Sequence, residues 1–192
     1  IGTSLFAAIG ILAALNERAR TGRGRHVDVA MFDAMVAMAD IVPFMWSMGQ
    51  RGKRRTLGIF DGFRARDGYF VVQVVREHQF AILAEAVAQP QWLTDARFAS
   101  RQGWAEHLEA VIRPAVEAWA ADKTKLEATR LLCERGLAAG PCNSAEDLIA
   151  DPHVRSHGML LEVPRPDGGE PLLVVGNPVK MSGVADEPAR RW

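Results

Sequence analysis

The chain has 192 residues, of which 48% are hydrophobic and 24% are charged, a composition typical of globular domains. Its 23 basic residues balance its 23 acidic ones and are scattered among them, so neither a nucleic-acid partner nor an anionic membrane is indicated. The apolar stretch at residues 5–15 is too short to span a bilayer. Cys133 and Cys142 lack metal-ligand spacing and are interpreted as reduced thiols of a cytoplasmic protein in preference to a disulfide.

The first segment is predicted to form a helix rich in small residues. Apolar side chains recur at helical spacing through residues 5–15, with alanine and glycine between them. A helix that is apolar on several sides packs against more than one neighbour, so we expect this one to be deeply buried. Thr3 or Ser4 can cap its start by accepting a bond from a free backbone N–H, and the glycine-containing run at residues 21–24 ends it.

A short strand and a second helix are predicted next. Residues 26–30 alternate between polar and apolar side chains, which indicates a strand, and residues 31–48 form an apolar run at helical spacing. Pro43 is expected to kink or break that helix, because proline has no backbone N–H to donate. The alternation of strand and helix is typical of a doubly wound α/β layer, so residues 1–48 are predicted to be part of an α/β domain.

A linker and a hairpin are predicted after the second helix. Residues 49–57 are basic and contain glycine between apolar segments, and we interpret them as a solvated interdomain linker in preference to a phosphate-binding loop. Strands at residues 60–66 and 69–75 flank Asp67 and Gly68, a dipeptide that favours a tight hairpin turn.

Helical spacing resumes after the hairpin. It predicts a helix over residues 77–88 and another over residues 104–119 that Pro114 can kink. Asp122 is expected to cap a third helix, which Gly136 ends.

The last part of the chain is predicted to hold an extended segment, a short helix and a second hairpin. Residues 138–143 are expected to be extended, and Ser144 is expected to cap a helix whose first turn is acidic, as the helix dipole favours. Residues 159–163 and 172–175 flank a Pro-Asp-Gly-Gly turn and form the second hairpin candidate.

No catalytic constellation is evident from the residues alone. The sequence has no G-x-S-x-G elbow, no dinucleotide-binding glycine pattern and no P-loop. His153 and His157 have the spacing of two ligands on one helix face, but no carboxylate motif accompanies them, and no metal site is predicted. His78 follows a strand end, where we favour a role in the helix start or the core over a catalytic one. Asp61 and Glu77 bracket the first hairpin and have no obvious partner.

Six short stretches, each weak alone, follow one another at informative spacing. They are the helix, turn and next helix of residues 8–34, F-x-x-x-D-G at residues 63–68, W-x-x-D-x-R-F-A at residues 92–99, G-x-x-x-G-P at residues 136–141, D-P-x-V at residues 151–154 and N-P-x-K-x-S at residues 177–182. This ordered set resembles the family III (CaiB/BaiF-type) CoA-transferases, a family that includes formyl-CoA transferase, carnitine CoA-transferase and alpha-methylacyl-CoA racemase. The resemblance covers essentially the whole chain.

The resemblance implies an α/β fold in which a partial Rossmann-like large domain is joined to a smaller α+β domain, as in the interlocked dimers of this family. Residues 1–48 would belong to the large domain, whose N-terminal portion is missing. Residues 49–163 would form the linker and the small domain, and residues 164–192 would return towards the large domain. The implied assembly is a cytoplasmic homodimer in which each chain is threaded through the other.

The resemblance also implies covalent chemistry. In this family an aspartate attacks the acyl-CoA thioester, CoA returns to form an aspartyl-CoA thioester, and an acceptor acid resolves it. Matching residues forward from Ala8 places that aspartate immediately before Ile1, so no catalytic residue is assigned within the chain, which is expected to be inactive alone. Coenzyme A is expected as a substrate, with an acyl-CoA and a carboxylic acid as partners and with no metal.

One segment of the chain is predicted to face the substrate. The family's small domain carries a glycine-containing loop that borders the active site of the partner subunit, and residues 55–60 correspond to it. Formyl-CoA transferase has several glycines there, whereas this chain has only Gly58. Gly58, Ile59 and Phe60 are therefore the predicted substrate-facing residues, with ordinary packing of linker and strand as the alternative.

Two other functions stay open. One is an acyl-CoA racemase or epimerase of the same superfamily, which moves a proton beside the thioester carbonyl. The other is an inert fragment or a dimerisation module. In either case an exposed apolar surface is expected wherever the missing half would pack.

Overall fold

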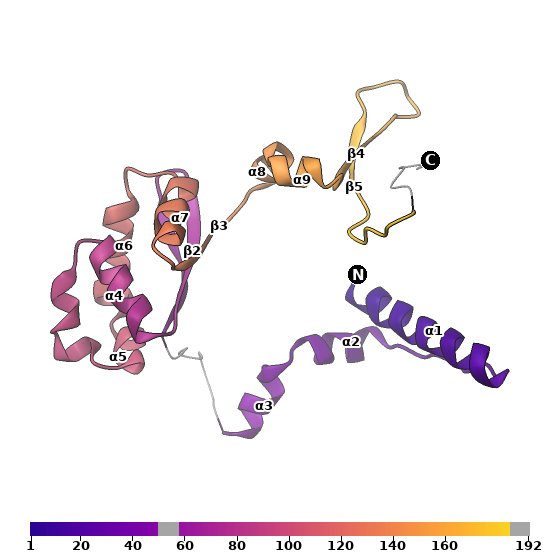
Figure 1. The fold of residues 1–192 in the computed structure, drawn as a ribbon, viewed down its shortest axis with the longest axis horizontal. Coiled ribbons are helices and arrows are strands. Elements are labelled where there is room, and N and C mark those ends of the chain that lie inside the picture. The colour runs from indigo at the N-terminus through magenta and orange to yellow at the C-terminus, as the bar shows by residue number, and fades with distance from the viewer. Residues whose placement is uncertain (50–57, 185–192) are drawn as a thin grey trace. The chain divides into compact units, whose positions relative to one another are not determined.

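The computed structural model of the chain describes residues 1–49 and 58–184. The chain divides into two compact units, Ile1–Arg55 and Thr56–Trp192. In its described residues the first unit is helical, whereas the second combines a sheet, a separate hairpin and several helices (Figure 1).

Three helices make up the described part of the first unit: α1 (Gly2–Thr21), α2 (Met31–Met38) and α3 (Ile41–Ser47). The extended segment after α1 runs back along it. A Cβ at Gly10 would lie 2.9 Å from a methyl group of Val27, so the small residue at this point permits the close approach.

Two expectations about local structure in this unit are wrong. α1 begins at Gly2 behind Ile1, and neither Thr3 nor Ser4 caps it. Residues 26–30 form no strand. Their alternating pattern needs a neighbouring strand edge, and the described residues of this unit offer none.

The second predicted helix breaks before Pro43, not at it. Asp40 has a φ of 45° and separates α2 from α3. Pro43 lies in the first turn of α3, where its missing N–H would have had no helical partner in any case. The proline therefore suits the start of α3.

The expectation that α1 is deeply buried is wrong for the chain as described. No residue of α1 is buried, and Leu5, Ile9 and Leu12 are each more than 60% exposed. Met31 and Phe32 of α2 are likewise about three-quarters exposed. Burial of an apolar helix depends on the elements that cover it, and the first unit exposes the kind of apolar surface that the sequence led us to expect.

A three-stranded antiparallel sheet organises the second unit, in the order β1 (Ile59–Ala65), β2 (Gly68–Val74) and β3 (Ala138–Pro141). β1 and β2 form the predicted hairpin, with Arg66 and Asp67 in its two-residue turn. The segment predicted to be extended after the helices supplies β3.

Side chains alternate between the two faces of this sheet. One face is buried against helices, and the other exposes polar and aromatic side chains. The helical elements of this part are α4 (Glu77–Ala86), η1 (Pro90–Leu93), η2 (Ala96–Phe98), α5 (Arg101–Glu106), the π-helical η3 (Leu108–Ile112), α6 (Arg113–Ala120) and α7 (Lys125–Glu134).

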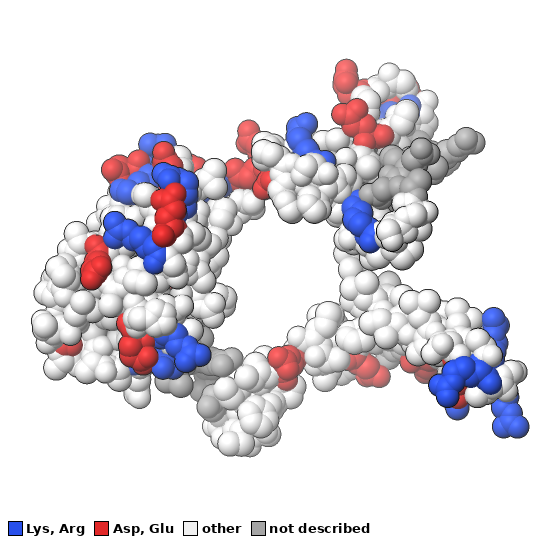
Figure 2. All heavy atoms as spheres, viewed as in Figure 1, with Lys and Arg blue, Asp and Glu red and all other residues white. Residues whose placement is uncertain are grey.

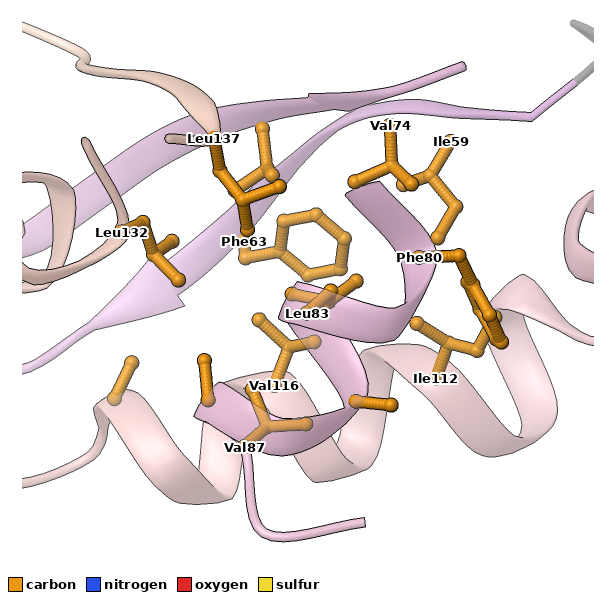
Figure 3. Packing of buried hydrophobic residues seen from close by; sticks show 14 of the residues in the cluster. Ile59, Phe63, Val74, Phe80, Leu83, Val87, Ile112, Val116, Leu132 and Leu137 are labelled. Atoms are coloured by element: carbon orange, nitrogen blue, oxygen red, sulfur yellow. The ribbon is translucent and has the colours of Figure 1, made fainter. Parts of the chain in front are cut away.

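The core lies between the sheet and these helices. Figure 3 shows Phe63 of β1 pointing toward Leu83 of α4 and Val116 of α6, and all three side chains are fully buried. Leu132 of α7 and Leu137 border the same cluster (Figure 3). Residues from the strands and from several helices thus fill one closely packed core.

Aromatic stacking extends the core. The ring of Phe80 is parallel to that of Trp104, with 4.4 Å between centroids, and it also packs on Trp92 and Phe98. The indole N–H of Trp104 donates to the carbonyl of Phe98 at 2.7 Å, so the buried polar group is satisfied. This cluster fixes the otherwise irregular connection that carries η1 and η2.

Thr124 caps α7, so the expectation that Asp122 is the cap is wrong. The Thr124 hydroxyl accepts the N–H of Glu127, and the Glu127 carboxylate accepts the N–H of Thr124. This reciprocal pair satisfies two backbone donors at once. Asp122 instead lies before the cap and binds the ammonium of Lys123.

Two short helices and the second predicted hairpin complete the described chain: α8 (Ala145–Ala150), α9 (Pro152–Ser156), β4 (Leu160–Val163) and β5 (Leu172–Val175). Ser144 caps α8, as expected. β4 and β5 pair antiparallel in a two-stranded sheet of their own.

β1 is an edge strand, and side chains of α6 cover its free edge. Arg113 donates to the carbonyl of Gly62 at 2.5 Å, and the Glu117 carboxylate accepts the backbone N–H of Arg64 at 3.1 Å. These bonds occupy groups that would otherwise be open to another strand.

Candidate functional site

The predicted substrate-facing segment lies at the start of β1, and residues 55–57 of the corresponding loop fall outside the described residues. Gly58 is buried and has a φ of 106°. A Cβ there would lie 2.5 Å from the carbonyl oxygen of Val74 and 3.3 Å from the Cα of Val75. Its N–H donates to the carbonyl of Arg101 at 3.3 Å. Both the backbone angle and the close approach of β2 therefore require glycine.

The next two residues point in opposite directions. Ile59 is fully buried in the core, whereas Phe60 is 59% exposed. Because neighbouring side chains of a strand lie on opposite faces, a molecule that contacts this segment from solvent would meet the ring of Phe60 and only the backbone of the other two. The assignment of Gly58, Ile59 and Phe60 as substrate-facing stays a prediction.

Phe60 belongs to the open face of the sheet. Its cross-strand neighbour is Gln73, which is exposed, and Tyr69 lies on the same face with 54% of its surface accessible. This face offers aromatic surface together with an amide group, which suits contact with an organic ligand better than coordination of a metal.

Both carboxylates that bracket the hairpin have partners, contrary to the sequence interpretation. Glu77 pairs with Arg101 at 2.9 Å, and this hydrogen bond, with help from the helix backbone, lowers the pKa of Glu77. Because both side chains are well exposed, the pair is a weak contribution to stability. His78 is exposed in the first turn of α4, which agrees with a position at the helix start.

Asp61 is part of an ionic network around Arg113. Arg113 lies 3.0 Å from Asp61, 2.8 Å from Glu109 and 3.6 Å from Glu117, and its guanidinium carbon is 5.2 Å from the centroid of the Phe63 ring. The hydrogen bonds that Arg113 donates to Glu109 are the main reason that the pKa of Arg113 is raised. A permanently charged, fully engaged guanidinium cannot exchange protons, so this network holds α6 on β1 and does no acid–base work.

A second network joins the hairpin turn to α7 and α8. The ammonium of Lys125, a residue only 8% exposed, bonds to the carboxylate of Asp147, and the backbone N–H of Lys125 donates to Asp67 at 2.7 Å. The bond from Lys125, together with the N–H and hydroxyl of Ser144, lowers the pKa of Asp147 to about 2. Such a carboxylate stays ionised at neutral pH and cannot serve as a general base.

The histidines that the structure describes form no metal-binding site. The rings of His153 and His157 are tilted by 34° to each other, with 4.2 Å between centroids, and both residues are exposed, in α9 and directly after it. Among residues 1–49 and 58–184, no three side chains of histidine, cysteine, aspartate or glutamate gather in a metal-binding arrangement. In the same part of the chain, no helix is both long enough and apolar enough to cross a membrane.

Known proteins match this chain over almost its whole length. Residues 1–191 match the family model described as CoA-transferase family III. The chain is 30% identical to the succinyl-CoA:mesaconate CoA-transferase of Haloarcula hispanica, over 98% of this chain and 48% of that protein. It is 31% identical to the succinyl-CoA–D-citramalate CoA-transferase of Chloroflexus aurantiacus, over 88% of this chain and 44% of that protein.

Solved structures agree with the sequence comparison. A CAIB/BAIF family protein from Brucella suis has a TM-score of 0.73 and 28% identity, over 95% of this chain and 48% of its own. Rv3272 from Mycobacterium tuberculosis has a TM-score of 0.76 and 25% identity, over 97% of this chain and 50% of its own. The mixed helix and sheet fold is thus shared with these proteins, and the chain spans about half the length of the relatives that it matches.

Proposed function

This chain belongs to CoA-transferase family III, and we propose that, in a protein with the full length of its relatives, it forms part of an enzyme that moves CoA from an acyl-CoA to a carboxylic acid. The observation that carries the proposal is the match of residues 1–191 to one family model, together with six motifs in the expected order. Coenzyme A would be a substrate in this reaction, and no step requires a metal.

The proposed chemistry passes through a covalent aspartyl intermediate. The carboxylate attacks the thioester carbonyl and releases CoA, which then attacks the resulting anhydride and expels the donor acid. The acceptor carboxylate attacks the aspartyl-CoA thioester in turn, and CoA leaves and returns once more to form the product thioester. Charges and atoms balance at each step, because every attacking anion, whether a carboxylate or the CoA thiolate, expels one other such anion.

We place the reactive aspartate immediately before Ile1. α1 has no side-chain cap at Ile1 and no acidic residue in its first turn. The unpaired N–H groups at such a helix start favour a nearby carboxylate in its anionic form, which is the nucleophilic one. Within the chain itself, the proposal assigns no catalytic residue.

Gly58 to Phe60 would contribute the contact of the small domain with substrate. In this proposal the backbone of Gly58 and the exposed ring of Phe60 border the acyl group, and the buried Ile59 anchors the segment in the core. The names of two relatives include succinyl-CoA as donor, so succinyl-CoA is the donor to test first.

The apolar faces of α1 and α2 would be covered in the complete protein. Exposed leucine, isoleucine and phenylalanine side chains on both helices support this expectation. We propose that residues 1–48 belong to a Rossmann-like large domain and that two copies of the full-length protein form an interlocked homodimer in the cytoplasm.

The test uses protein from the complete gene with succinyl-CoA and a panel of isotopically labelled carboxylic acids, in deuterated water. The proposal predicts that label enters the CoA-ester pool only when both donor and acceptor are present. Exchange of the hydrogen beside the thioester carbonyl, without transfer of CoA between acids, would instead favour the racemase branch. If neither reaction is observed with any pair of donor and acceptor, the assignment of a transferase is wrong.

A further inference from the structure

A small cavity lies at the end of β1 opposite to the predicted substrate-facing segment. It has a volume of about 270 Å³ and is lined by Arg64, Ala65, Arg66, Glu117 and Ala121. A cavity of this size lies just below the range of pockets for drug-sized molecules, so it suits a smaller ligand. Two of the five lining residues are arginines, which raises the question of whether the cavity binds an anion.

Arg66 is held in place by backbone groups. Its N–H donates to the carbonyl of Lys123 at 2.9 Å, and its Nη1 donates to the carbonyl of Asp122 at 3.1 Å. A neutral carbonyl orients the guanidinium, and Arg66 also attracts the nearby carboxylates of Asp122 and Glu127, although neither lies within ion-pair distance of it. The remaining N–H groups of the fork are thus pre-positioned for an anionic acceptor.

The carboxylates around the cavity are engaged with other groups. Glu117 accepts the backbone N–H of Arg64 and lies 3.6 Å from Arg113. Asp122 lies 2.7 Å from the ammonium of Lys123. Glu127 accepts the N–H and the hydroxyl of Thr124. Among the residues that the structure describes, neither the guanidinium of Arg64 nor that of Arg66 forms an ion pair with any of them. Acidic and basic side chains are otherwise interleaved over this unit (Figure 2).

We propose that this cavity binds a small anion through carboxylate or phosphate oxygens, with Arg64 and Arg66 as the binding residues. Planar guanidinium groups match both anions because each presents paired N–H donors to paired oxygens. Glu117 would select against ligands that bring their negative charge to its side of the cavity. Binding of an anion can be measured without any transfer of CoA, so this proposal stands or falls independently of the transfer reaction.

The test is isothermal titration of the protein from the complete gene with inorganic phosphate, succinate and acetate at constant ionic strength. Saturable binding is expected for phosphate, for succinate or for both. The anion with the higher affinity shows whether the cavity prefers phosphate or carboxylate oxygens. Arg64→Gln is expected to weaken that binding at least about tenfold, which corresponds to the loss of one charge-assisted hydrogen bond. Higher salt is expected to weaken it further.

Arg135→Gln is the matched control, because Arg135 is an exposed arginine at the end of α7, outside the cavity. The affinity of the Arg135→Gln variant for the anion is expected to equal that of the unmodified protein. If Arg66→Gln unfolds the protein by releasing the carbonyl of Asp122, Arg64→Gln still tests the proposal, since no described group accepts a bond from the guanidinium of Arg64. Absence of saturable binding for all three anions, or equal weakening by Arg135→Gln, would overturn the proposal.

Discussion

Replacing Gly58 with alanine tests whether this residue is glycine for a physical reason. Its φ of 106° is a conformation that a residue with a Cβ adopts at a cost of about 1–3 kcal/mol. The added Cβ would lie 2.5 Å from the carbonyl oxygen of Val74, a backbone atom of the paired strand that cannot turn aside. Forcing such a contact costs about 1–3 kcal/mol more. We therefore expect Gly58→Ala to lower the free energy of unfolding by about 2–6 kcal/mol.

Urea unfolding followed by tryptophan fluorescence measures this effect, because three tryptophans lie near the core that β1 and β2 help to form. With an m-value of about 2 kcal/mol/M, the midpoint should fall by about 1–3 M. Gly62→Ala is the matched control on the same strand, since a Cβ there would meet nothing closer than 4.0 Å. A Gly58→Ala midpoint that coincides with that of Gly62→Ala would show that position 58 does not require glycine.

Three further substitutions test the packing, the cap and an ion pair. Phe80→Ala removes the ring at the centre of the aromatic cluster and should cost about 3–5 kcal/mol of unfolding free energy by urea titration, whereas Phe80→Leu should cost clearly less. Thr124→Ala should cost about 1 kcal/mol and Asp122→Ala much less in the same assay, and the reverse order would contradict the cap assignment. The pKa of Asp147 is lowered to about 2, so its stabilising effect is present above pH 4 or so and is lost as pH falls toward 2. Asp147→Asn should flatten the pH dependence of stability in that window, and its exposed neighbour Glu146→Gln should not.

Elements specified by neighbouring residues were predictable from the sequence. The hairpin around Asp67 and the helix capped by Ser144 are both present, because the information for a tight turn or a cap lies within a few residues. The position of the α7 cap was missed by two residues, since both Asp122 and Thr124 are competent caps and only Thr124 is followed at the right distance by a glutamate.

Features that depend on partners were not predictable. The alternation in residues 26–30 indicated a strand, but pairing requires an edge that the described first unit lacks. The burial of α1 likewise depends on what packs against it. The pairing of Asp61 with Arg113 joins residues far apart in sequence, and no local pattern announces such a contact.

The candidate site was predictable only in part. The resemblance indicated Gly58, Ile59 and Phe60 as a group, whereas the structure separates their possible roles into a backbone contact, a core anchor and an exposed ring. The cavity beside Arg64 and Arg66 carried no sequence signal, because its lining comes from both the hairpin and α6.

Trapping of the covalent intermediate tests the central claim most directly. Protein from the complete gene is incubated with a panel of acyl-CoAs that includes succinyl-CoA, quenched with hydroxylamine and mapped by peptide mass spectrometry. We expect a hydroxamate on an aspartate immediately before Ile1, which appears only with an accepted donor. The absence of any modified carboxylate with every donor, in a protein that still binds CoA, would contradict the proposed aspartyl mechanism.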